Sequence, residues 1–205
     1  MKTLPSLQRS ARAIALASAL LVPGALLSSS PALAAPEQYV LDTKGAHAFI
    51  QFKIKHLGFS WLLGRFDTFS GNFTVDKDKI ENSSVKVDID VASVNSNHAE
   101  RDKHLRGEDF FDVAKFPQAS FASTKVTKTG DNTADIEGNL TLKGVTKPVT
   151  LKAVYIGSGD DPWGNYRAGF EATTEIVLKD FGIDYNLGPS ATSAQIYISA
   201  EGIRQ

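Results

Sequence analysis

The chain contains 205 residues, of which 42% are hydrophobic and 22% charged, and its formal net charge is −1. A charge balance this close to neutral argues against a nucleic-acid partner, which requires clustered lysine and arginine. The absence of cysteine excludes disulfides, thiolate nucleophiles, cysteine-ligated zinc, haem attached through cysteine and a lipid-modified N-terminal cysteine.

Residues 1–34 have the pattern of a secretory signal peptide. Lys2, Arg9 and Arg12 form a positive start, residues 13–27 form an apolar run, and Ala32-Leu33-Ala34 supplies the small residues of a cleavage site. The apolar run is shorter than the roughly 20 residues that cross a bilayer comfortably. Cleavage would leave a single domain, residues 35–205, with a net charge of −4. We therefore expect a free, soluble protein in the periplasm.

The rest of the chain shows mostly a period of two in its apolar residues, which is typical of half-buried antiparallel strands with one wet face. The clearest segments are 50–54, 85–91, 134–142, 166–178 and 196–198. We count eight or nine strands, no long helix and no repeat. This pattern predicts an all-β antiparallel fold, either a closed barrel or a sandwich.

Two strands are less regular. Between Arg65 and Val75 the apolar parity shifts, which predicts a β-bulge near Thr68 or Gly71. Pro148 lies near the start of another strand, and this position predicts a strand end or edge because proline cannot donate to a ladder.

The segment Arg101–Pro117, RDKHLRGEDFFDVAKFP, interrupts the strands. Asn97 and Glu100 form a capping-box pattern and Gly107 is a natural terminator, so a short helix is expected over 97–107. Asp102 and Arg106 are four residues apart and can pair along it. Because such a helix is polar nearly all round, we expect a lid over the sheet that is held by salt bridges. The expected lid residues are Arg101, Asp102, His104, Leu105, Arg106, Phe110 and Phe111. Phe110 and Phe111 are expected to plug the space beneath the lid.

Phenylalanine is abundant, with 12 residues against two tryptophans. Several phenylalanines lie on strand faces expected to point inwards. Rings on one wall of a small barrel leave gaps that aliphatic side chains would fill better. Composition alone leaves two readings open, an ordinary aromatic-rich core and a hollow barrel that holds a slender ligand.

Several motifs in order resemble the YceI-like family of exported bacterial proteins, over nearly the whole chain after residue 34. They are YVLDTKGAHAFIQFKIKHLGFSWLLGRF, SSVKVDIDVASV, RDKHLRGEDFFDVAKFPQASF, GNLTLKGVTKPVTL and LKDFGI. The resemblance implies a lipocalin-like barrel with a long apolar tunnel for a polyisoprenoid lipid, an isoprenoid quinone or a similar long-chain amphiphile. Asp42-Thr43 departs from the usual Asp-Pro and affects only a turn. The expected tunnel wall consists of Ile50, Phe52, Ile54, Phe66, Phe69, Phe73, Phe170 and Ile176.

His56 shares the inward parity of its strand, and Arg65 lies near the same rim. One reading is that these two groups recognise a polar headgroup at the tunnel mouth. The alternative is that His56 bonds to backbone and that Arg65 pairs with Asp67 or Asp109.

Other chemistry has weaker support. The charged residues of the lid are dense enough to suggest catalysis, but a polar helix is more often solvated and self-paired. His98 and His104 are six residues apart, which does not place two metal ligands on one helical face. We expect no metal and no cofactor.

Three hypotheses follow for the function. The first is a carrier for an isoprenoid lipid or quinone-like molecule, compatible with transient membrane contact and with a homodimer. The second is an enzyme acting on such a lipid through His56 or residues 101–112. The third is a stress-response or assembly module whose barrel is filled.

Overall fold

The structure is a computed structural model that describes residues 35–205. The expected signal peptide, residues 1–34, lies outside the described residues. The described part of the chain forms eleven strands, one α-helix and three short 3-10 helices. The strands are β1 (Glu37–Leu41), β2 (Phe49–His56), β3 (Ser60–Phe66), β4 (Phe69–Val75), β5 (Ser84–Asp90), β6 (Val94–Asn95), β7 (Gln118–Lys128), β8 (Thr133–Leu142), β9 (Val145–Asp160), β10 (Tyr166–Val177) and β11 (Ser193–Arg204). The helices are α1 (Ala99–Leu105), η1 (Ile80–Asn82), η2 (Val91–Ser93) and η3 (Leu178–Phe181).

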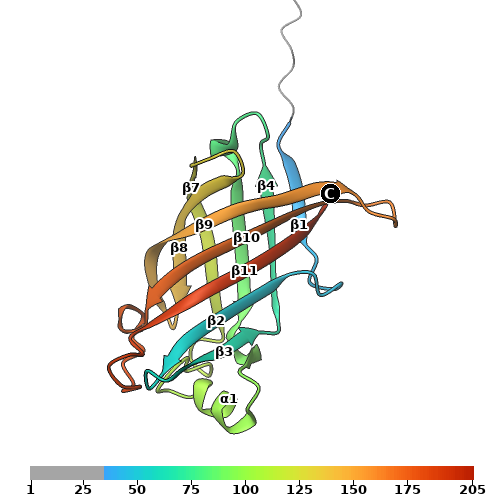
Figure 1. The fold of residues 1–205 in the computed structure, drawn as a ribbon. Coiled ribbons are helices and arrows are strands. Elements are labelled where there is room, and N and C mark those ends of the chain that lie inside the picture. Colours follow the sequence, from blue (N-terminus) through green and yellow to red (C-terminus); the bar gives the residue numbers. More distant parts are fainter. Residues whose placement is uncertain (1–34) are drawn as a thin grey trace, which may run out of the picture. The chain divides into compact units, whose positions relative to one another are not determined.

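Eight strands close into an antiparallel barrel in the order β1-β4-β5-β7-β8-β9-β10-β11, and β1 pairs with β11 to complete the ring. Figure 1 shows this wall, with α1 at one end of the barrel. Closure gives every ring strand a partner on both sides over part of its length, which is the usual solution for an antiparallel sheet of this size. The barrel predicted from the sequence is therefore confirmed, and the sandwich alternative is wrong.

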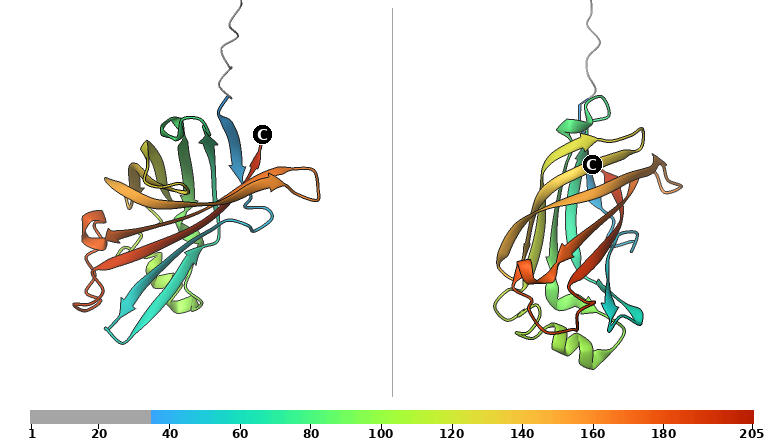
Figure 2. Two further views of the ribbon diagram at one scale, coloured as in Figure 1. Left: turned by 45° about the horizontal axis from the view of Figure 1, so that its top comes forward. Right: turned by 60° about the vertical axis from the view of Figure 1, so that its left-hand side comes forward.

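The remaining strands extend the wall at the α1 end. The last residues of β11 pair with β1, whereas Ala194–Ser199 of the same strand pair with β2. From there the sheet continues through β3 to the short strand β6, against which α1 packs. The two views of Figure 2 show the β2–β3 hairpin projecting beside α1.

Alternation along the strands determines which side chains face the barrel interior. On β10, Ala168, Ala172 and Ile176 are buried, whereas the intervening Thr173 and Glu175 are more exposed. Pro148 pairs with β8 at a point of β9 that precedes its pairing with β10. It therefore has a strand on one side only, in agreement with the expected edge position.

Two local predictions are wrong. The parity shift after Phe66 is no bulge, because β3 ends there and β4 begins at Phe69, so the chain passes from the extension of the sheet into the ring. The helix is shorter than expected and Asn97 does not cap it. Asn97 adopts a left-handed conformation (φ 63°), and the cap is His98, whose Nδ1 accepts a hydrogen bond from the Arg101 amide at 3.2 Å.

In residues 35–205, no helix combines the length and the apolar character that crossing a bilayer requires.

Candidate functional site

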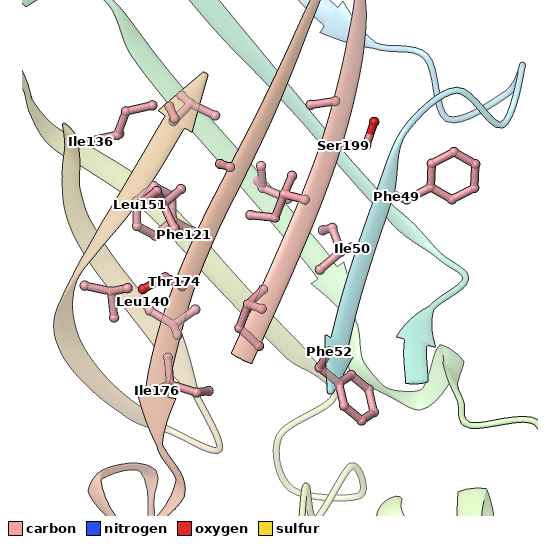
Figure 3. Close-up of a pocket in the computed structure, with 18 of the residues that line it drawn as sticks. Phe49, Ile50, Phe52, Phe121, Ile136, Leu140, Leu151, Thr174, Ile176 and Ser199 are labelled. Atoms are coloured by element: carbon pink, nitrogen blue, oxygen red, sulfur yellow. The ribbon is translucent and has the colours of Figure 1, made fainter. Parts of the chain in front are cut away.

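The barrel encloses an apolar cavity of about 1170 Å³. This volume exceeds the roughly 300–1,000 Å³ common for small-molecule pockets. All eight residues expected in the tunnel wall line it: Ile50, Phe52, Ile54, Phe66, Phe69, Phe73, Phe170 and Ile176. Figure 3 shows part of this wall, with side chains from strands around the barrel directed at a common space.

Small side chains help to keep the interior open. Ala153 of β9 and Ala172 of β10 lie opposite each other in the register, and both are buried and line the cavity. A methyl group cannot reach across the barrel, so the space in front of these two strands remains unfilled. Sequence reasoning placed Ala172 on an inward face but missed its part in the cavity.

Two phenylalanine rings lie over glycines of the neighbouring strand. A Cβ atom on Gly64 would lie 2.3 Å from Cζ of Phe52, and one on Gly138 would lie 2.4 Å from Cζ of Phe121. The rings therefore rest against the sheet where the missing side chains leave room. This arrangement explains how a phenylalanine-rich interior remains hollow, and it favours the second of the two readings of the composition.

Further aromatic rings form one wall near β1 and β4. The rings of Tyr39 and Phe73 stack with centroids 4.9 Å apart, and Phe170 meets Phe73 edge-on at 5.4 Å. Tyr155, which the sequence reasoning missed, approaches Phe170 at 5.4 Å. Aromatic pairs of this geometry stabilise particular ring orientations, in addition to the stabilisation from burying apolar surface. This wall of the cavity therefore has a defined shape.

Acidic, basic and histidine side chains line the cavity only near its two ends. At the α1 end they are Lys55, His56, Arg101 and His104, and at the opposite end they are Lys77, Asp78, Glu81, Lys128 and Asp131. The stretch between them is apolar, apart from hydroxyl groups such as those of Thr174 and Ser199. The cavity can thus hold a long hydrocarbon along its length and a polar group at a mouth.

The mouth at the α1 end is built mainly of aromatic rings. His104 lies edge-on to Phe110 at 4.9 Å and to Tyr185 at 5.2 Å, and its Nε2 lies 3.0 Å from a carboxylate oxygen of Asp109. Phe111 contacts Phe66 at 5.7 Å. The expected plug residues therefore line this end of the cavity, and Tyr185 joins them from the segment after η3. Nothing in the sequence spacing places that segment here.

The remaining predicted lid residues support α1 without lining the cavity. The buried carboxylate of Asp102 accepts hydrogen bonds from the Ser96 amide at 2.8 Å and from the Ser96 hydroxyl. Arg106 donates to the Val94 carbonyl at 3.5 Å. The expected Asp102–Arg106 ion pair is therefore wrong, because the carboxylate is used to tie the helix to the preceding turn.

The two predicted headgroup residues have different positions. His56 lines the cavity at the end of β2, and its ring makes no hydrogen bond or ion pair with another described residue. Arg65 does not line the cavity; its Nε donates to Asp67 at 2.6 Å, which is the alternative that the sequence left open. Of the two predicted headgroup residues, His56 alone is therefore placed to meet a headgroup at this mouth.

An ion cluster links the outer ends of several strands. The Arg167 guanidinium on β10 contacts Asp42 at 2.6 Å, Asp161 at 2.5 Å and Glu201 at 2.5 Å. The hydrogen bond from Arg167, with a second from His47, lowers the pKa of Asp42 to about 2. Burial opposes ionisation of Asp161, but hydrogen bonds led by that of Arg167 hold its pKa below the usual range.

Asp42, His47 and Glu201 also have the mutual distances of a metal-ligand group, within 4.8 Å. Arg167 already supplies the positive charge that these carboxylates require, since it contacts two of the three residues. The cluster is therefore a structural clamp that joins the β1–β2 connection to the β9–β10 hairpin and β11.

Comparisons with known proteins agree with this architecture. The model of the YceI-like domain matches residues 39–202. A UPF0312 protein of Azotobacter vinelandii is 56% identical over 187 residues, covering 91% of this chain and 96% of its own length. A UPF0312 protein of Pectobacterium atrosepticum is 56% identical over 180 residues, covering 88% and 92%.

Solved structures show the same fold. BcnA of Burkholderia cenocepacia aligns with a TM-score of 0.68 and 25% identity, covering 76% of this chain and 96% of its own. A Campylobacter jejuni YCEI protein aligns with a TM-score of 0.66 and 30% identity, covering 74% and 90%. A polyisoprenoid binding domain from Saccharophagus degradans, with a TM-score of 0.60 and 18% identity over 82% and 98%, shares the fold.

Proposed function

This chain belongs to the YceI-like family, and we propose that it binds and carries a long-chain amphiphile, an isoprenoid lipid or a quinone-like molecule, in the periplasm. The observation that carries the proposal is the apolar cavity of about 1170 Å³ whose charged lining residues lie at its ends. A guest of this chemistry matches both parts of the cavity: its hydrocarbon chain fits along the apolar wall, and its polar group fits at a mouth. The polyisoprenoid binding of the Saccharophagus degradans domain, which has the same fold, supports this choice of guest.

The wall supplies the affinity in this proposal. Each methylene removed from water contributes about 0.8 kcal/mol, so about ten of them contribute on the order of 8 kcal/mol before the losses of association. A headgroup at the mouth mainly fixes the orientation of the guest. His56, whose ring has no partner among residues 35–205, lies at this mouth together with Lys55 and can make that contact.

We propose binding without chemical conversion. General acid–base catalysis needs a positioned group within hydrogen-bond reach of the reacting atoms, and the long central part of the cavity presents alkyl and aryl groups with a few hydroxyls. Within the 101–112 segment, Asp102 and Arg106 support the segment itself, through bonds to Ser96 and Val94.

Mass spectrometry of the natively purified protein, followed by lipid extraction, tests the proposal. We expect a co-purifying amphiphile that leaves on denaturation and rebinds to the emptied protein. A protein that is empty and rejects such lipids would support the scaffold hypothesis instead. Chemical change of the lipid on incubation, abolished by His56→Ala, would support the enzyme.

The proposed location rests on the pattern of residues 1–34. Fractionation of the cells and N-terminal sequencing test it. We expect a periplasmic product that begins at Ala35. A cytoplasmic product that retains residues 1–34 would contradict the export.

A further inference from the structure

We propose that the β2–β3 hairpin, residues 49–66, docks onto the surface of a bilayer that contains anionic phospholipid, and brings one mouth of the cavity to the membrane. This inference concerns the outer surface of the protein and goes beyond binding of a guest in the cavity.

The hairpin exposes large apolar side chains at and near its tip. Phe59 is 88% exposed, Leu63 62% and Leu57 57%, and the Trp61 ring lies beside them on the outward face of β3. Soluble proteins rarely expose such side chains together unless they contact a partner or a membrane. Trp and Phe beside an apolar tip are typical of segments that lie in the interface of a bilayer.

The turn itself is unusual in chemistry. Leu57 and Gly58 both have positive φ, 52° and 83°, and the Phe59 amide donates to the His56 carbonyl at 2.9 Å. Turns of this kind usually carry Asn, Asp or Gly at their first central position, because a branched side chain is strained there. A leucine held in this conformation and exposed to solvent places an apolar group at the extreme end of the hairpin.

The charges of the hairpin all have one sign. Residues 49–66 contain Lys53, Lys55 and Arg65 and no aspartate or glutamate, although the whole chain carries slightly more acidic than basic residues. Lys53 and Lys55 lie 4.8 and 4.2 Å from the centroid of the Trp61 ring. Asp67 pairs with Arg65 at the base of the hairpin, away from the tip. With no acidic residue in the hairpin to pair with them, the two lysines remain available to anionic headgroups, which attract nearby lysines.

The hairpin tip also forms part of a mouth of the cavity. Lys55, His56 and Leu57 line the cavity at this end, and Gly188 of the segment after η3 lies close to Leu57. The views of Figure 2 show the hairpin beside α1 at the same end of the barrel. A bilayer in contact with the tip would face the mouth directly, so that an apolar chain could move between the two without crossing water.

A second copy of the chain is a poorer occupant of this surface. In a two-fold symmetric contact the same patch meets itself. Lys53 and Lys55 of one copy would then face those of the other, with no acidic residue in either hairpin to offset the repulsion. Anionic lipid has the complementary charge and also accommodates the apolar tip.

Co-flotation with vesicles tests the inference. The full-length protein and its variants are mixed with vesicles made of phosphatidylcholine alone or of phosphatidylcholine with phosphatidylglycerol. N-terminal sequencing establishes that all samples share one N-terminus. Phe59→Ser should weaken partitioning about tenfold or more, because a phenyl ring no longer leaves water. The double variant Lys53→Gln/Lys55→Gln should lose about tenfold on the anionic vesicles and little on the neutral ones. The control Ile156→Ser, at a 61% exposed position of β9, should bind as the wild type does.

Three results would overturn the inference. The first is that the wild type does not bind vesicles. The second is that Phe59→Ser binds vesicles as well as the wild type does. The third is that the wild type is a dimer which Phe59→Ser converts to a monomer, with vesicle binding unchanged. The vesicle assay needs no guest in the cavity. Its failure would therefore leave the proposed carrier function standing, and an empty cavity would leave docking standing.

Discussion

A phenylalanine at position 172 should block the cavity without unfolding the barrel. Ala172 lies on β10 opposite Ala153 of β9 and Ile198 of β11, and it belongs to a buried cluster with Phe121 and Leu151. Its methyl group lines the cavity where the two alanines leave space. A benzyl group would enter that space from the wall and occupy the path of a guest.

The expected loss of affinity is large. A ring at this level displaces about five methylene-sized groups of a bound chain, each contributing about 0.8 kcal/mol, or about 4 kcal/mol in all. That difference corresponds to a roughly thousandfold weaker Kd. Fold stability should change little, since overpacking of filled cores destabilises by about 1–3 kcal/mol and here the ring enters unfilled space.

Fluorescence titration of emptied protein with a long-chain lipid, alongside thermal unfolding, measures both quantities. The matched control is Thr173→Phe, the next residue on the same strand, whose side chain is exposed on the outer face. It should bind lipid as the wild type does. An Ala172→Phe protein that folds and binds with unchanged Kd would show that the guest does not pass this level of the barrel.

Three further outcomes follow from the structure. Phe52→Ala should weaken lipid binding by about 1.5–3 kcal/mol and more than His56→Gln, because the wall supplies most of the affinity; equal losses in a titration would contradict this ranking. Gly138→Ala should destabilise the fold by about 1–3 kcal/mol in chemical denaturation, since its Cβ would lie 2.4 Å from the Phe121 ring and 2.6 Å from the Ala122 carbonyl oxygen; unchanged stability would mean that both neighbours shift freely. Arg167→Met should destabilise by about 3 kcal/mol through unpaired carboxylates. Because the folded pKa of Asp42 is lowered to about 2, its stabilisation is complete above pH ~4 and is lost as the pH falls towards 2; the melting temperature of the Arg167→Met variant should depend less on pH in that range.

The strands were predictable because alternation is a local property of the sequence. The segments 85–91, 134–142 and 166–178 each coincide with an observed strand to within one residue at either end. The exceptions are places where pairing partners change. The parity shift after Phe66 marks the passage of the chain from the β3 extension into the ring, and such a change of partners depends on residues far away in sequence.

The helix of the lid shows a different limit. A capping-box pattern at Asn97 and Glu100 and an i,i+4 pair at Asp102 were reasonable from local rules. In the structure Asp102 is buried, and its carboxylate accepts hydrogen bonds from the amide and the hydroxyl of Ser96. Ser96 lies in the turn before the helix, which the helical spacing rules do not include. Buried polar groups take the partner that satisfies them in the fold, and that partner was not visible from helical spacing.

Openness of the barrel was the property least accessible from the sequence. Twelve phenylalanines fit a filled core as well as a hollow one. What decides between the two is where each ring lies, and Phe52 and Phe121 lie over Gly64 and Gly138 of the adjoining strands. Those pairings follow from the register of β2 with β3 and of β7 with β8, which a single sequence does not specify.

The two mouths of the cavity differ in charge, and this difference would give the proposed lipid guest a direction. At the α1 end the charged lining residues are Lys55 and Arg101, beside two histidines, whereas at the other end aspartate and glutamate accompany the lysines. One of those lysines, Lys77, is paired with Glu37 at 2.8 Å. An anionic or oxygen-rich headgroup is therefore favoured at the α1 mouth, with its chain along the apolar wall. In this orientation the headgroup would lie at the mouth that the β2–β3 hairpin, as proposed, brings to a bilayer.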